Sequence, residues 1–192
     1  MDAVAALRAG RPVVLPTDTV YGLCADAESE AACRRALAAK GRPEGQPAAL
    51  LCADVRGLLD RVPELPEPIV RALLPGPYTI VFANIARLYP WLADDTIGVR
   101  VPTLPESAVA AVRAVGAVMA TSANLHGGPD PRRLSEVPEE IRAVCGALVD
   151  GGELPGVPST VLDLTGLEPR VLREGAVPAA EALARVAAVG RT

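Results

Sequence analysis

Short apolar runs separated by turn residues recur along this chain of 192 residues. The first, "PVVLPT", is aliphatic and β-branched and ends at a proline, as buried strands often do. Later runs have the same length and character, and some alternate apolar with polar residues. We therefore predict strands at 12–17, 48–53, 78–83, 96–102, 117–124, 147–152, 159–164 and 170–175.

Other segments repeat their apolar residues at helical spacing. In the Ala-rich segment 28–40, Cys33, Ala36 and Leu37 share one face, and Gly41 stops the helix just after Lys40. This places Lys40 in the last helical turn. Further helices are predicted at 67–74, 106–115, 135–144 with Ser135 as its N-cap, and 179–189.

Strands and helices are interleaved irregularly, which favours an α/β fold with a mixed, twisted sheet and flanking helices. With 192 residues and 50% apolar content, the chain suits one domain with a good core. We find no internal repeat and no low-complexity linker. We therefore expect a single domain over residues 1–192.

Composition excludes some classes of function. Aromatic residues are only 3% of the chain, so rows of rings for stacking nucleic-acid bases are absent from the sequence. The net charge of -4 argues against a surface coated in positive charge, although a local basic concavity is compatible with it. Function must come from a few locally placed side chains.

The four cysteines are far apart in the sequence, form no C-x-x-C pair, and are accompanied by a single histidine, His126. This pattern argues against a structural zinc site and favours buried, reduced thiols. The N-terminus has an acid at Asp2 and no long apolar run, so we expect neither a signal peptide nor a membrane span. A cytoplasmic protein is expected.

Lys40 is the only lysine, and the other eighteen basic side chains are arginines. An ammonium is a compact, mobile charge that can follow a phosphate, whereas a guanidinium is a rigid planar fork. Alternatively, Lys40 is only a cation that meets the dipole at a helix end. Composition leaves both interpretations open.

Polar side chains gather where predicted strands end, which is where open α/β sheets place ligands. Arg100 lies within an apolar strand, so it requires an anionic ligand or an internal carboxylate. The other groups could also stabilise turns, cap helices or face solvent, and for the first of them, taken alone, a polar turn is the favoured interpretation. They are Thr17, Asp18, Thr19 and Tyr21; Lys40, Arg42 and Gln46; Ser122 and Asn124; Ser159 and Thr160; and Arg173.

Several well-known site motifs are missing from the sequence. No G-x-x-x-x-G-K-[ST] loop and no G-x-G-x-x-G turn follows a strand, so a bound nucleotide would need a different cradle. No G-x-S-x-G elbow occurs either. The four cations Lys40, Arg42, Arg100 and Arg173, with nearby hydroxyls and amides, suit phosphates and a carboxylate.

Seven segments together resemble the YrdC/TsaC family of threonylcarbamoyl-AMP synthases. The resemblance runs from about Val13 to Ala176, nearly the whole chain, and the segments occur in the order of the family. They are "LPTDTVYGL", "AKGRP" with a proline four residues later, "LLPGPYTIV", "GVRVP", "TSANLHGGPDP", "PSTVLDL" and "VLREGAV".

The resemblance implies a YrdC-like fold and an enzyme that joins ATP, L-threonine and bicarbonate into L-threonylcarbamoyladenylate with release of pyrophosphate. It implies Mg²⁺ on the triphosphate and no metal held by protein ligands alone. A downstream threonylcarbamoyl-transferase complex would use the product to modify tRNA, and the resemblance leaves a direct contact with tRNA open.

The family's K-x-R and S-x-N signatures match Lys40, Arg42, Ser122 and Asn124 here. The resemblance implies that Lys40 and Arg42 are catalytic and hold the triphosphate, with Asn124 and Arg173 as further ATP contacts. It also implies that L-threonine is bound by Thr19, Arg100, Ser122 and Ser159.

The sequence departs from the family in places. Gln46 replaces a common asparagine, Leu51 stands where some longer members have histidine, and Arg132 replaces a small hydroxyl residue. These changes leave the roles of Gln46 and Arg132 open. Two alternatives also remain, a domain that forms carbamoyl-adenylate from carbamoyl phosphate and an RNA-binding module. The acidic composition and few aromatics weigh against the second.

Overall fold

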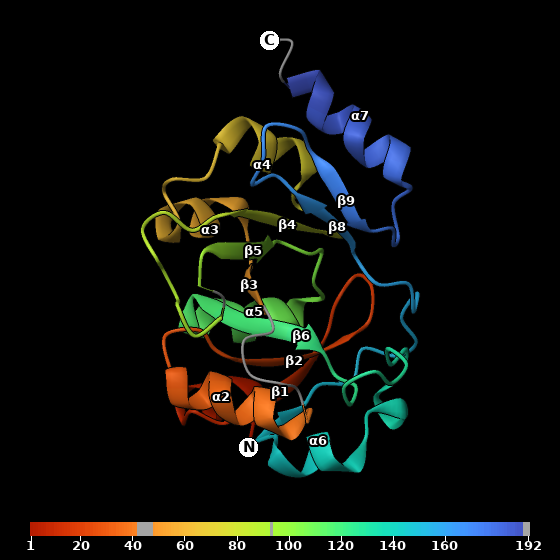
Figure 1. Cartoon of the computed structure of the whole chain (residues 1–192). Coiled ribbons are helices and arrows are strands. Elements are labelled where there is room, and N and C mark those ends of the chain that lie inside the picture. The colour runs from red at the N-terminus through yellow and green to blue at the C-terminus, as the bar shows by residue number, and fades with distance from the viewer. Residues whose placement is uncertain (42–47, 93, 190–192) are drawn as a thin grey trace.

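A single mixed sheet runs through the computed structural model, which describes residues 1–41, 48–92 and 94–189 (Figure 1). Three neighbouring strand pairs are parallel and the other five are antiparallel, as predicted for a mixed α/β sheet. In sheet order the strands are β7 (Ala147–Leu148), β1 (Val13–Pro16), β2 (Tyr21–Asp26), β6 (Ala117–Ser122), β3 (Ala49–Cys52), β5 (Thr96–Arg100), β4 (Tyr78–Ala83), β8 (Thr160–Asp163) and β9 (Arg170–Arg173).

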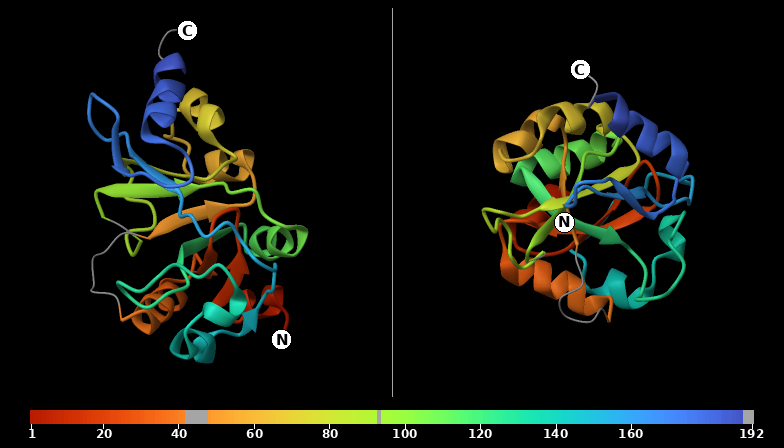
Figure 2. Two further views of the ribbon diagram at one scale, coloured as in Figure 1. Left: turned by 90° about the vertical axis from the view of Figure 1, so that its right-hand side faces the viewer. Right: turned by 45° about the horizontal axis from the view of Figure 1, so that its top comes forward.

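Helices cover both faces and both ends of this sheet (Figure 2). Two helices, α2 and α6, gather at the β1 and β2 end, and α4 and α7 pack together at the β8 and β9 end (Figure 1). The helices are α1 (Ala3–Arg8), α2 (Glu30–Ala39), α3 (Val55–Arg61), α4 (Glu67–Leu73), α5 (Glu106–Val115), α6 (Glu139–Val144) and α7 (Ala179–Val189), with a 3₁₀ turn η1 (Leu134–Glu136).

Strand β1 is apolar throughout because both of its faces are buried. Val13 and Leu15 pack with α1 and α5, while Val14 points to the opposite face and joins the main core there. Complete burial of each such side chain contributes roughly 1.5–3 kcal/mol. The run "VVLP" therefore reflects a strand covered on two sides.

The sequence prediction missed three elements. Helix α1 is only six residues long and starts at an Asp2 cap, and α3 contains Gly57, so neither has a strong helical pattern. Strand β2 was not predicted, because the hydroxyls and Asp18 directly before it are typical of a turn. The turn ends at Val20, where the Thr17 hydroxyl donates to the carbonyl of Val20 at 2.7 Å, and β2 begins directly at Tyr21.

The predicted start of the helix at 135–144 is wrong. Pro138 occupies the N-cap position of α6, which begins at Glu139, and the preceding residues form the separate turn η1. Ser135 lies inside that turn and caps nothing. A proline lacks the N–H that a continuous helix would use, which explains the break.

All four cysteines are buried and free, which confirms the prediction of buried thiols. Burial raises the pKa of Cys24, Cys33 and Cys52 to about 12 and that of Cys145 to about 11. Such thiols stay protonated at neutral pH and behave as small apolar side chains.

Within the described part of the chain, no helix has both the length and the apolar character that crossing a membrane requires.

Candidate active site

A cavity of about 670 Å³ opens on one face of the sheet. Strands β4, β5, β6 and β8 supply its floor, and β9, the end of α2 and the loop after β6 supply further lining residues. This volume lies within the range of small-molecule and cofactor sites. Six predicted site residues line it: Lys40, Arg100, Ser122, Asn124, Ser159 and Arg173.

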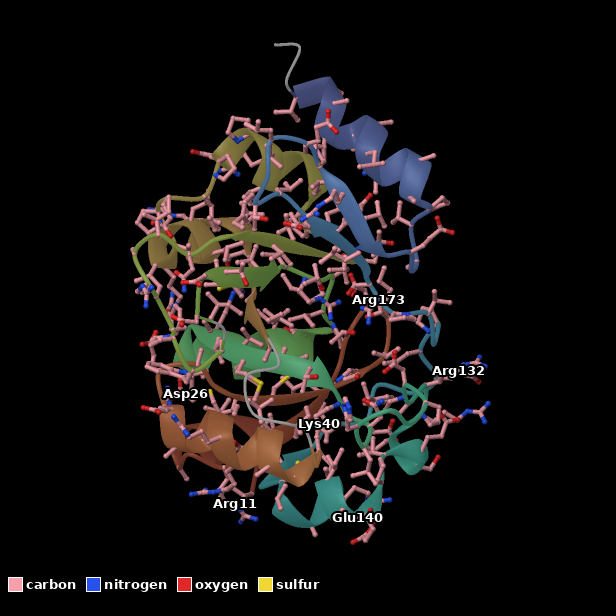
Figure 3. All side chains as sticks on the ribbon, viewed as in Figure 1. Arg11, Asp26, Lys40, Arg132, Glu140 and Arg173 are labelled. Carbon is pink, nitrogen blue, oxygen red and sulfur yellow. The ribbon has the colours of Figure 1, made fainter. Side chains whose placement is uncertain are left out.

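Lys40 is the C-cap of α2, and its side chain turns inward (Figure 3). It is only 4% exposed, and its ammonium donates to the carbonyl of Ser122 at 2.5 Å and to Oδ1 of Asn124 at 2.8 Å. A cation that merely complements a helix dipole would extend into water instead. The burial of Lys40 therefore favours a role in the cavity over a surface role.

Asn124 is held by contacts on both ends of its amide. Its Oδ1 accepts from the Ser122 hydroxyl at 2.6 Å as well as from Lys40, and its Nδ2 donates to the carbonyl of Gly128 at 2.6 Å. The backbone N–H of His126 also donates to the carbonyl of Lys40 at 2.9 Å. These bonds join the loop after β6 to the end of α2.

Arg100 pairs with an internal carboxylate, which was one of the two partners that the sequence left open, and it also lines the cavity. Its Nη2 lies 3.3 Å from Oδ1 of Asp18, and the two side chains are only 12% and 13% exposed. Burial lowers the pKa of Arg100 and raises that of Asp18, although each charge partly offsets the shift of the other. Among the described residues, the Nε of Arg100 has no hydrogen-bond partner. A bound anion could supply that partner.

Thr19 lies outside the cavity lining. It is fully buried, and its hydroxyl accepts from Nη2 of Arg100 at 3.3 Å and shares a hydrogen bond of 3.0 Å with Thr17. In this structure Thr19 therefore acts on the cavity through Arg100.

Arg173 and Ser159 lie together at another part of the cavity, across the sheet from Lys40. We call this pair the cationic corner, after the charge of Arg173. The guanidinium of Arg173 donates to the carbonyl of Ser159 at 2.9 Å and to its hydroxyl at 3.2 Å. The same hydroxyl lies 2.8 Å from that of Thr79 on β4. Arg173 on β9 thus holds the segment before β8, and the Ser159 hydroxyl links that segment to β4.

Two predicted residues, Arg42 and Gln46, lie outside the described residues. Arg132 points away from the cavity lining: it pairs with Glu153 at 2.6 Å, as does Arg133. Arg132 thus fixes the loop after β6 to the segment that leads to β8.

Sequence reasoning missed the far end of the cavity. Thr96, Asp163 and Thr165 line it there, with Val81 and Val161 between them and the cations. The strand patterns "YTIVFA" and "STVLDL" could have indicated these residues, because every second side chain of a strand lies on the same face of the sheet. Nothing in the sequence showed that these faces meet.

Gly175 makes the closest backbone approach near the cationic corner. A Cβ at this position would lie 2.2 Å from the carbonyl oxygen of Pro158 and 2.6 Å from the carbonyl carbon of Ser159. We predict that Gly175→Ala displaces Ser159 and lowers the free energy of unfolding by roughly 1–3 kcal/mol, measured by denaturant unfolding. The matched control is Gly166→Ala, where the nearest atom is 3.9 Å away, and it should change stability by less than about 0.5 kcal/mol. Equal effects of the two would contradict the packing argument.

The charges of the cavity define the ligands it can take. Lys40, Arg100 and Arg173 provide three cations, and hydroxyls and amides lie beside them. Such a set binds phosphate and carboxylate groups, particularly where water is excluded. The described residues contain no cluster of three or more His, Cys, Asp or Glu side chains that could hold a metal ion.

The comparisons with known proteins agree with this geometry. Residues 5–175 match the model of the family Sua5_yciO_yrdC, described as "Telomere recombination". A Halorhodospira halophila protein named threonylcarbamoyl-AMP synthase is 36% identical over 179 residues, which cover 90% of this chain and 88% of that protein.

Two solved structures are also similar. Pyrococcus abyssi Sua5 complexed with L-threonine has a TM-score of 0.86 and 34% identity, covering 96% of this chain and 56% of the other. E. coli YciO has a TM-score of 0.78 and 30% identity, covering 94% of this chain and 90% of the other. The fold, the cavity and the match over most of the sequence lead to one conclusion: the chain belongs to the Sua5/YciO/YrdC family.

Proposed function

We propose that this protein is an L-threonylcarbamoyladenylate synthase, a nucleotidyltransferase that joins ATP, L-threonine and bicarbonate and releases pyrophosphate. The observation that carries the proposal is that Lys40, Asn124, Arg100 and Arg173 line the same cavity. The cavity offers cations for a triphosphate and a buried guanidinium for a carboxylate. Relatives that carry the synthase name support the same activity.

The amino acid would bind with its carboxylate at Arg100 and beside the hydroxyls of Ser122 and Ser159. The Nε of Arg100 has no hydrogen-bond partner in the described part of the chain, so it can donate to that carboxylate. Thr19 would position Arg100 from behind through the 3.3 Å hydrogen bond between them. The triphosphate would lie along Lys40, Asn124 and Arg173, and we propose that Arg42 joins them.

The reaction requires two bond changes at the nucleotide. The amine of threonine and bicarbonate give a carbamate with loss of water, and a carbamate oxygen then bonds to the α-phosphorus. The bond from that phosphorus to the bridging oxygen breaks, and the electron pair leaves with pyrophosphate. The protein's residues would align the two anions and neutralise the developing charge, with Lys40 and Arg42 nearest the phosphates.

Mg²⁺ would enter with ATP as part of the substrate. The ion would be held mainly by phosphate oxygens and water, as is usual for Mg²⁺ bound to a nucleotide. The product would pass to a downstream threonylcarbamoyl-transferase complex that modifies tRNA in the cytoplasm.

We predict that the purified protein releases pyrophosphate from MgATP and bicarbonate only when L-threonine is present. The reaction is followed by a coupled pyrophosphate assay, with threonine omitted in one arm and replaced by carbamoyl phosphate in another. Release without threonine would contradict the proposal. Release that depends on carbamoyl phosphate would instead indicate a carbamoyl-adenylate enzyme.

A further inference from the structure

The far end of the cavity has a chemistry that phosphates and carboxylates do not explain. Val161 and Asp163 lie on one face of β8, Ser159 immediately precedes the strand, and all three line the cavity. Four residues of strand span about 13 Å. The anion-binding corner at Ser159 and the carboxylate of Asp163 are therefore separated by roughly the length of a nucleoside.

Between these two ends the cavity lining includes the apolar side chains of Val81 and Val161 and the backbone of Gly98. Val81 on β4 lies opposite Asp163 of β8 on one side and opposite Gly98 of β5 on the other. These three residues are therefore neighbours across the sheet, and the glycine has no side chain to cover the floor. A Cβ at Gly98 would meet Thr79 only at 3.6 Å, an ordinary contact, so the protein itself does not require glycine there. The absent side chain leaves room above the floor for the face of a ring.

Asp163 has a fixed orientation and a remaining acceptor site. Its Oδ1 accepts from the backbone N–H and the hydroxyl of Thr165 at 2.9 and 2.6 Å, and its Oδ2 accepts from Arg170 at 2.5 Å. Each carboxylate oxygen can accept about two hydrogen bonds, so Oδ2 retains one.

The charge of Asp163 is also fixed. The hydrogen bonds from Thr165, and then the nearby Arg170, hold the pKa of this carboxyl below its usual value. An ionised carboxylate that is 6% exposed and lies in a cavity lining repels anions and only accepts hydrogen bonds. Its ligand group must therefore be a donor.

We propose that the base of the nucleotide lies over Val81, Gly98 and Val161, and that Oδ2 of Asp163 accepts a hydrogen bond from the exocyclic amine of adenine. This inference rests on the proposed function and names the residue that selects the nucleotide. A 6-oxopurine would present an acceptor to the carboxylate and is rejected. In this arrangement the ribose, which joins the base to the phosphates, lies between the far end and the cations.

The test compares ATP with inosine triphosphate, because the two differ at position 6 of the purine. For the wild-type protein, we expect binding by calorimetry and kcat/KM in the pyrophosphate assay to favour ATP by roughly 10- to 100-fold, the value of a hydrogen bond to a charged group. In Asp163→Asn the amide can place an N–H donor where Oδ2 was. We expect this variant to lose that preference, with weaker binding of ATP and stronger binding of inosine triphosphate.

Two further variants separate selection from structural support. Arg170→Gln removes the ion pair that holds Asp163 but keeps the carboxylate, and it should retain the preference for ATP. Glu168→Gln, an exposed change in the same hairpin, should also retain it. If Arg170→Gln loses the preference as Asp163→Asn does, Asp163 only supports the hairpin and the proposal fails.

Two other outcomes overturn the inference alone. One is equal binding of ATP and inosine triphosphate to the wild-type protein. The other is an Asp163→Asn variant whose KM for threonine rises while its preference between nucleotides is unchanged, which would place the amine of threonine at Asp163. If the wild-type protein binds neither nucleotide, the proposed function fails with it.

Discussion

Replacing Lys40 with alanine is expected to lower the rate of threonine-dependent pyrophosphate release by roughly 10²- to 10³-fold, the usual cost of removing one preorganised charge beside a reacting group. Single-turnover assays at saturating ATP and threonine measure the loss. Lys40→Arg should also be impaired, because a planar guanidinium is too bulky for the space between the Ser122 carbonyl and Oδ1 of Asn124.

The fold should survive this change at some cost. An exposed cation at a helix end would contribute at most about 1 kcal/mol. Lys40 is buried and donates hydrogen bonds to the Ser122 carbonyl and to Asn124, so we expect Lys40→Ala to cost about 1.5–3 kcal/mol in stability. Arg34→Ala, which removes an exposed ion pair on the same helix, is the matched control and should leave turnover unchanged. Wild-type turnover of a folded Lys40→Ala protein would remove the lysine from the mechanism.

Replacing Arg100 with glutamine is expected to raise the KM for threonine by 100-fold or more while leaving the affinity for ATP alone within a few-fold. The substitution removes the proposed carboxylate partner. It also leaves Asp18 largely buried without its cation, which should lower stability by about 3 kcal/mol at neutral pH. Calorimetric titrations with threonine and ATP, together with denaturant unfolding, separate the two effects.

The pH dependence of this variant follows from the sign of the Asp18 shift. Burial raises the folded-state pKa of Asp18 above its ordinary value, so ionisation of Asp18 disfavours the folded state as pH rises through that pKa. Without Arg100 the penalty grows. The stability gap between wild type and Arg100→Gln should therefore narrow at acid pH, where Asp18 is protonated.

A double variant supplies the control for Arg100. Arg100→Gln combined with Asp18→Asn should regain most of the stability, because no buried charge is left, but it should not regain threonine binding. Restored binding of threonine would show that Arg100 acts through charge balance with Asp18 and contacts no carboxylate.

Local patterns predicted much of the fold. The helix ending at Lys40 and the helix at 179–189 carry their own stop signals or period, and the aliphatic runs mark most strands. These features depend on neighbours within a few residues. Strand β2 was missed because its identity comes from pairing with β1 and β6, and its own residues resemble the turn before it.

The candidate site, like the fold, could be predicted from the sequence only in part. The residue types of the cationic groups, and a lysine unique in the chain, could be recognised in the sequence as chemistry for anions. Their distances could not, since Lys40 and Asn124 are 84 residues apart in the chain but 2.8 Å apart in space. The sequence did not single out Asp163, because a carboxylate at a strand end usually stabilises a turn; its place in the cavity lining is visible only in the tertiary structure.

The sequence by itself determined where the chain forms most of its strands and helices, which side chains can bind anions, and which family it resembles. The tertiary structure decided that Arg100 pairs with Asp18, that Thr19 lies behind Arg100 and hydrogen-bonds it, and that Asp163 lines the same cavity as the cations. The reason is physical. Backbone preference and hydrophobic period are set by nearby residues, whereas a cavity and its charges arise only when strands distant in sequence are paired in one register.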